Sequence, residues 1–133
     1  MKHIFNSIIS IVLTILTFVF GGWDVSIQLL CLIVLLDYLT GILKAVATKS
    51  LNSYTGTKGI IKKIGYFILV AVAVVTDRIT GGTGAIRTLV IYFFIANESL
   101  SILENWGKLG LPIPKKLTSI LEQLKNKGKD DAE

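Results

Sequence analysis

Four long apolar stretches separated by short polar turns dominate the chain. They cover residues 4–20, 25–43, 60–79 and 85–103. A helix needs about 20 mostly apolar residues to cross the hydrocarbon core of a bilayer, with a range of about 17 to 25. The strand alternation of an outer-membrane barrel is absent from these stretches. The pattern therefore predicts an all-α integral membrane protein with four transmembrane helices.

Glycine and proline residues mark where these helices end. The pair Gly21-Gly22 closes the first stretch, and the pair Gly81-Gly82 separates the third from the fourth. Pro112 follows the fourth stretch, where it stops a helix from continuing. We therefore predict that residues 1–111 form one transmembrane helical domain.

The first stretch has a second interpretation. With Lys2 in front of it, residues 4–20 resemble a signal peptide, but Phe18-Val19-Phe20 offers no small-residue cleavage pattern before Gly21. We predict an uncleaved first span. If this segment were cleaved or lay flat on the membrane, three spans would remain and the N-terminus would be outside.

A short amphipathic segment follows the last span. Its apolar residues recur at i, i+3, i+4 and i+7, and they are Leu117, Ile120, Leu121 and Leu124. This spacing predicts an amphipathic helix over residues 112–126. Such a helix suits the inner membrane surface or a neighbouring subunit. The polar residues 127–133 are expected to form a disordered tail.

Composition agrees with a membrane protein and limits the partners. Apolar residues make up 52% of the chain and charged residues 17%, with a mean hydropathy of +0.67. A soluble domain carries about 25% charged residues, and disorder over most of the chain is excluded by its hydrophobicity. The net charge is +5, but no basic stripe alternates with aromatic residues. Nucleic acid is therefore not an expected partner.

Basic residues are distributed unevenly between the predicted loops. With the N-terminus in the cytoplasm, twelve of the fourteen lysines and arginines fall on the inner side, and only Arg78 and Arg87 fall on the outer side. The positive-inside rule then predicts that both termini lie in the cytoplasm. The inner lysines also suit the anionic lipids of the inner leaflet. The expected location is the bacterial cytoplasmic membrane.

Charged residues within the predicted spans are the most informative. Asp37 and Glu98 lie nearly level, at about 18 and 20 Å from the outer edge at about 1.5 Å per residue. Lys44 follows Asp37 by two helical turns, and Lys63 lies near the start of the neighbouring span. A charge near a helix centre costs about 2.5 to 3.5 kcal/mol on insertion scales. The geometry allows these four residues to form one cluster in the inner half of the membrane.

Uncharged polar and small residues form further patterns on three helices. Asn6, Ser10, Thr14 and Thr17 fall within an arc of about 80° on the first helix. Arg87, Glu98 and Asn105 share one edge of the last span. Gly41 and Ala45 are a small pair suited to close helix approach. The candidates for polar or oligomerisation contacts inside the membrane are Asp37, Gly41, Lys44, Lys63, Arg87, Asn97, Glu98, Ser101, Asn6, Ser10, Thr14 and Thr17.

Three interpretations of these residues remain open. The polar groups hold helices together within one subunit, or they form contacts between subunits and line water in an assembly. The third interpretation is a proton-coupled carboxylate of a small transporter. Spacing alone does not separate them.

Enzyme chemistry has little support. His3 is the only histidine, so no set of serine, histidine and aspartate is available. The segment Thr80–Gly84 is a turn and not a phosphate-binding loop, because no strand precedes it. Cys31 is the only cysteine and lies within an apolar run. We expect no catalytic, cofactor-binding or metal-binding residues.

Several motifs from Ile33 onward resemble the toxin-secretion/phage-lysis holins of Gram-positive bacteria and their phages. Together they span about three quarters of the chain. They are Asp37-Tyr38-Leu39-Thr40-Gly41, Leu51-Asn52-Ser53, Gly56, Lys58-Gly59-Ile60, Lys63, Arg87-Thr88, Ala96-Asn97-Glu98-Ser99-Leu100-Ser101-Ile102-Leu103-Glu104-Asn105, Gly110-Leu111-Pro112-Ile113-Pro114 and Lys115-Lys116-Leu117.

The resemblance implies a small protein that accumulates in the cytoplasmic membrane, forms homo-oligomers and opens non-selective lesions. A cell-wall hydrolase, or in some relatives a toxin, then leaves the cytoplasm. The resemblance implies no cofactor and no catalytic residue. Met1 is the only methionine, so the chain contains no internal ATG start for a shorter form. The alternatives are a small proton-coupled transporter, an accessory membrane subunit or a structural assembly factor.

Overall fold

The computed structural model describes residues 1–131, which form five helices. These are α1 (Lys2–Phe20), α2 (Val25–Ala47), α3 (Ser53–Thr80), α4 (Ala85–Lys108) and α5 (Lys115–Asp130). No strand occurs among the described residues. Helices α1 to α4 are each long and apolar enough to cross a membrane. The predicted fold class, an all-α protein with four candidate spans and a C-terminal helix, is confirmed.

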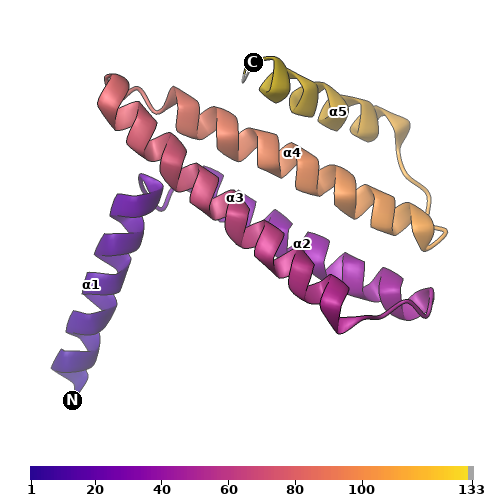
Figure 1. Cartoon of the computed structure of the whole chain (residues 1–133), viewed down its shortest axis with the longest axis horizontal. Helices are drawn as coiled ribbons and strands as arrows, with labels where there is room; N and C mark the ends of the chain where they lie inside the picture. The colour runs from indigo at the N-terminus through magenta and orange to yellow at the C-terminus, as the bar shows by residue number, and fades with distance from the viewer. Residues whose placement is uncertain (132–133) are drawn as a thin grey trace.

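Helix α4 organises the molecule. It packs against α2 and α3 on one side and against α5 on the other, whereas α2 and α3 touch each other little. Figure 1 shows α2, α3 and α4 running side by side, α5 lying along α4, and α1 departing alone from the bundle. We call the end of the bundle with the Gly21-Gly22 and Gly81-Gly82 turns the glycine end, and the opposite end, which holds Lys44, the lysine end.

Most helices extend beyond the apolar stretches that predict them. Helix α3 begins at Ser53 and not at residue 60, because the Asn52 side chain accepts a hydrogen bond from the backbone N–H of Tyr54 (2.8 Å) and caps a polar first turn. Helix α5 continues to Asp130, into the segment expected to be disordered from residue 127. Residues 132 and 133 of that predicted tail lie outside the described residues.

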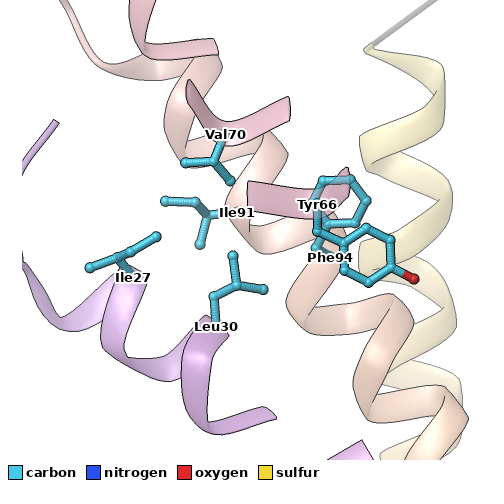
Figure 2. Packing of buried hydrophobic residues seen from close by; sticks show 6 residues of the cluster. All are labelled: Ile27, Leu30, Tyr66, Val70, Ile91 and Phe94. Atoms are coloured by element: carbon cyan, nitrogen blue, oxygen red, sulfur yellow. The ribbon is translucent and has the colours of Figure 1, made fainter. Parts of the chain in front are cut away.

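Apolar packing closes the bundle toward the glycine end. The rings of Tyr66 and Phe94 stack with their centroids 4.2 Å apart. Two residues from each of α2, α3 and α4 make up the buried cluster in Figure 2, and they are Ile27, Leu30, Tyr66, Val70, Ile91 and Phe94. Interior packing of this kind fixes the rotation of each helix about its axis.

Helix α1 is attached to the bundle only through its C-terminal end. It has no buried residue, and it packs mainly against α3, with an edge-on contact between Phe20 and Phe67. Gly21 ends the helix at φ 78°, and a Cβ at this position would lie 2.9 Å from Arg87 Nε. Glycine is therefore required here both by the backbone conformation and by the close approach of Arg87.

Candidate functional site

An ionic cluster joins three helices inside the bundle. Lys63 on α3 donates hydrogen bonds to Asp37 on α2 and to Glu98 on α4, with Nζ 2.6 Å from Asp37 Oδ2 and 2.5 Å from Glu98 Oε2. The side chains are only 12%, 11% and 2% exposed, respectively. One ammonium group therefore holds two carboxylates at a position shielded from solvent.

Neutral polar groups complete the cluster. Asn105 Nδ2 donates to Asp37 Oδ1 (3.3 Å) and to Thr40 Oγ1 (3.1 Å). Ser101 and Tyr66 line the same cleft as Asp37 and Glu98. Among the described residues, no buried side-chain nitrogen or oxygen lacks a hydrogen-bond partner. The cluster is therefore satisfied within one chain, as buried charges must be.

The sequence pattern allows one cluster of four residues: Asp37, Lys44, Lys63 and Glu98. The structure brings all of them together except Lys44. Lys44 is half-buried and lines a cleft beside the cluster, but no ion pair of Lys44 occurs among residues 1–131. Gly41 lies near Asn105, because a Cβ on Gly41 would be 3.8 Å from the Asn105 amide nitrogen. Asn97 donates a long hydrogen bond (3.5 Å) to the Tyr66 hydroxyl.

The cleft lies at the lysine end of the bundle and has a volume of about 960 Å³. Helices α2, α3, α4 and α5 all contribute to its wall. Its charged lining residues include Asp37, Lys44, Lys62, Glu98, Glu104 and Lys125. Mixed charge of this kind suits water or another polar surface and does not define a catalytic centre. No group of three metal-ligating side chains occurs in the described part of the chain.

A second polar cluster surrounds Arg87 at the glycine end. Its guanidinium binds both carboxylate oxygens of Asp24, at 2.8 and 3.0 Å. It also donates to the carbonyl oxygens of Phe20 (2.5 Å) and Gly22 (3.3 Å). Arg87 thereby fastens the α1–α2 turn to α4. It shares an edge of α4 with Glu98, as the spacing predicts, but it lies in a different cluster.

Asp77 was not predicted as a polar contact and is almost fully buried. Its carboxylate accepts the backbone N–H groups of Ile86 (3.1 Å) and Arg87 (2.8 Å). These are first-turn donors of α4 that have no partner within the helix. Gly84, the residue before α4, has no side chain to cap them, so α3 supplies the cap. The signal in the sequence is an acidic residue just before a glycine-rich turn.

Asp24 is also a partner that the sequence pattern did not single out. It lies in the turn before α2, and its carboxylate accepts a hydrogen bond from the Ile27 N–H (3.2 Å), an ordinary N-cap contact. The hydrogen bonds from Arg87 hold the pKa of Asp24 below its usual value of 3.8. A carboxyl group with a lowered pKa stabilises the fold above its unfolded pKa, and this stabilisation is lost as pH falls through the folded value.

The effect of Asp24→Asn on stability is therefore expected to depend on pH. At pH 7 the variant should unfold at a lower temperature than the wild type, because asparagine gives Arg87 no negative partner. Below pH 3.8, the usual aspartate value, the difference should shrink progressively, as the wild-type carboxyl becomes protonated. Thermal unfolding in detergent micelles at pH 7, 5 and 3 measures this difference. An equal difference at all three values would contradict the charged pairing.

The polar stripe of α1 lies away from the bundle. Ser10 and Thr14 donate to carbonyl oxygens one turn earlier in their own helix, at 2.9 and 2.7 Å. In the described structure, no other helix offers a hydrogen bond to the side chains of Asn6 or Thr17. All four residues are exposed. Within residues 1–131, the side chains of these four predicted polar residues make no hydrogen bond to another helix.

A family model and several bacterial proteins are similar to this chain. The sequence model of the bacteriophage holin family matches residues 14–126. An uncharacterised 14.9 kDa protein in the nagH 3' region of Clostridium perfringens is 47% identical over 115 residues, which cover 86% of this chain and 87% of that protein. The uncharacterised protein Lmo0128 of Listeria monocytogenes is 37% identical over 116 residues (87% and 83%). YtkC of Bacillus subtilis, also uncharacterised, is 32% identical over 112 residues (84% and 84%). No solved structure matches the chain.

Proposed function

This chain belongs to the bacteriophage holin family, and we propose that it acts as a holin. Copies accumulate in the bacterial cytoplasmic membrane, associate with one another and open non-selective lesions. A cell-wall hydrolase, or a toxin where the gene serves secretion, then leaves the cytoplasm through these lesions. The activity needs no cofactor and no catalytic residue.

The observation that carries this proposal is the extent of the family match. It covers residues 14–126, which include the last seven residues of α1, all of α2, α3 and α4, and most of α5. The four apolar helices agree with a multi-pass membrane protein. In the proposed orientation both termini are cytoplasmic, because the lysine end then faces the anionic inner leaflet.

Helix α1 is the element that we assign to contacts between copies. The buried charges of α2, α3 and α4 are satisfied within the chain, so they need no partner from a second copy. Helix α1 instead is exposed over residues 2–19, including the stripe of Asn6, Ser10, Thr14 and Thr17. Polar groups on a helix in lipid favour another helix or water. A second copy would provide such a partner.

Association through such contacts depends steeply on concentration. Interhelical hydrogen bonds in membranes contribute only about 0.6 kcal/mol each. Many copies are therefore needed before assembly outweighs dispersal in lipid. This behaviour suits a protein that accumulates silently and then permeabilises the membrane abruptly.

Reconstitution of the purified protein in liposomes tests the function. Above a threshold protein-to-lipid ratio, we expect release of both a small dye and an encapsulated folded protein, without chemical selectivity. A small transporter would instead show saturable, pH-coupled flux of one solute. A structural assembly factor would show neither, and either result would contradict the holin proposal.

The stripe on α1 gives this experiment a matched pair of variants. Ser10→Leu with Thr14→Leu removes two contacts of about 0.6 kcal/mol each, so the threshold ratio should rise by about eightfold. Ile8→Leu with Ile15→Leu changes the opposite face and should leave the threshold within about twofold of wild type. Equal thresholds for the two double variants would show that α1 does not contact other copies through this stripe.

A further inference from the structure

Helix α5 packs along a candidate membrane span and not beyond its end. Gly128 is buried against Phe93 of α4, and a Cβ on Gly128 would lie 3.1 Å from the Phe93 Cβ. Phe93 lies fifteen residues before the end of α4 at Lys108, which corresponds to about 22 Å of helix. Since α4 is about 36 Å long, α5 reaches past the middle of the span (Figure 1).

The composition of α5 is incompatible with a lipid environment at that depth. Seven of its sixteen residues are charged, and α5 is not among the helices suited to cross a membrane. Its side away from the bundle is polar and exposed, with Lys116, Gln123, Lys127 and Asp130. Charges at the middle of a bilayer must face protein or water. Next to α4, the outer side of α5 therefore requires water.

The other two sides of α5 face the cleft and an apolar edge, which leaves only the outer side for water. Thr118 and Lys125 are half-buried and line the polar cleft beside the ionic cluster. Leu117, Ile120 and Leu124 form a separate stripe and are 43%, 46% and 48% exposed. This stripe is an edge that lipid or a neighbouring copy can cover while the polar side stays in water.

We propose that α5 lies against α4 in the assembled lesion, where its outer polar side lines the aqueous path. In a subunit dispersed in lipid, α5 leaves α4 and lies on the membrane surface, with Leu117, Ile120 and Leu124 toward the acyl chains. The proposal rests on the proposed function, because it needs a water-filled assembly. It deepens that function by naming the surface that faces the water.

A disulfide between α4 and α5 tests this proposal. In a Cys31→Ser background, the pair Phe93→Cys and Gly128→Cys places two Cβ atoms close to the 3.5 to 4.5 Å separation of a disulfide. The matched control is Phe93→Cys with Lys127→Cys, whose second cysteine lies on the exposed side of α5. The protein is reconstituted at increasing protein-to-lipid ratio, oxidised, and measured for disulfide yield and dye leakage.

We expect the 93–128 disulfide yield to rise at least fivefold with protein density, in step with leakage, and to exceed the control yield by at least fivefold in leaky vesicles. The oxidised protein should leak within about twofold of the reduced protein. A yield at the control level in leaky vesicles would overturn the proposal, as would a disulfide that abolishes leakage and is reversed by reductant. Absence of leakage at every density in all proteins would instead contradict the holin function itself.

Discussion

Replacing Lys63 with alanine is expected to destabilise the α2–α3–α4 bundle by about 3 to 5 kcal/mol. The variant leaves Asp37 and Glu98 buried without the ammonium group that neutralises them, and loss of one partner from a buried ion pair has this magnitude of cost. The free energy of unfolding, measured by titrating SDS into detergent micelles, reports the change. Accumulation of the protein in membranes should fall with it.

Two further variants test whether the loss of stability comes from the buried ionic cluster. Lys62→Ala removes a neighbouring lysine that is exposed, and it should change the free energy of unfolding by less than about 1 kcal/mol. The triple variant with Lys63→Met, Asp37→Asn and Glu98→Gln removes all three charges together and should recover much of the lost stability. If Lys63→Ala were as stable as Lys62→Ala, the cluster would not hold the three helices together.

Replacing Arg87 with lysine is expected to release α1 from its fixed direction. Lysine keeps the positive charge but has no planar fork, so it cannot bind both Asp24 oxygens and the carbonyls of Phe20 and Gly22 together. The free energy of unfolding should fall by about 1.5 to 3 kcal/mol. The ion pair with Asp24 contributes little to this loss, because the Asp24 carboxylate is 52% exposed and water screens it.

The direction of α1 can be measured separately from stability. Spin labels on α1 and α3 should give a narrow distance distribution in the wild type and a broad one in Arg87→Lys. Arg78→Lys is the control, since exposed Arg78 makes a single hydrogen bond to the Phe18 carbonyl and lies over the Phe18 ring. A narrow distribution in Arg87→Lys together with a broad one in Arg78→Lys would show that Arg78, and not Arg87, fixes the direction of α1.

The two polar clusters have different consequences for assembly. The Asp37–Lys63–Glu98 cluster fixes three helices as one unit, and apolar packing around Ile91 and Phe94 supports it. The Arg87 cluster fixes only the last residues of α1 and the turn that follows. In the proposed assembly, the rest of α1 is therefore the part that meets other copies while the bundle stays intact.

The sequence predicted the four apolar helices, and it placed Asp37 and Glu98 level with each other on two of them. Hydrophobic length and helical periodicity are local properties, so the level positions of Asp37 and Glu98 followed from counting residues. The edge shared by Arg87, Glu98 and Asn105 followed in the same way. The predicted span from residue 60 does not include the polar first turns of α3, because a capped turn at Asn52 carries no hydrophobic signal.

The choice of partners was decided only by the tertiary structure. Lys63 and not Lys44 binds the two carboxylates, because packing of the core rotates α3 so that Lys63 points between α2 and α4. Asp24 and Asp77 reach Arg87 and the start of α4 from neighbouring elements, and α5 folds back along α4 to place Gly128 on Phe93. Such contacts depend on how helices rotate and cross. Local patterns along a single chain determine which residues must be buried or paired. Packing between helices determines which residue becomes the partner of each.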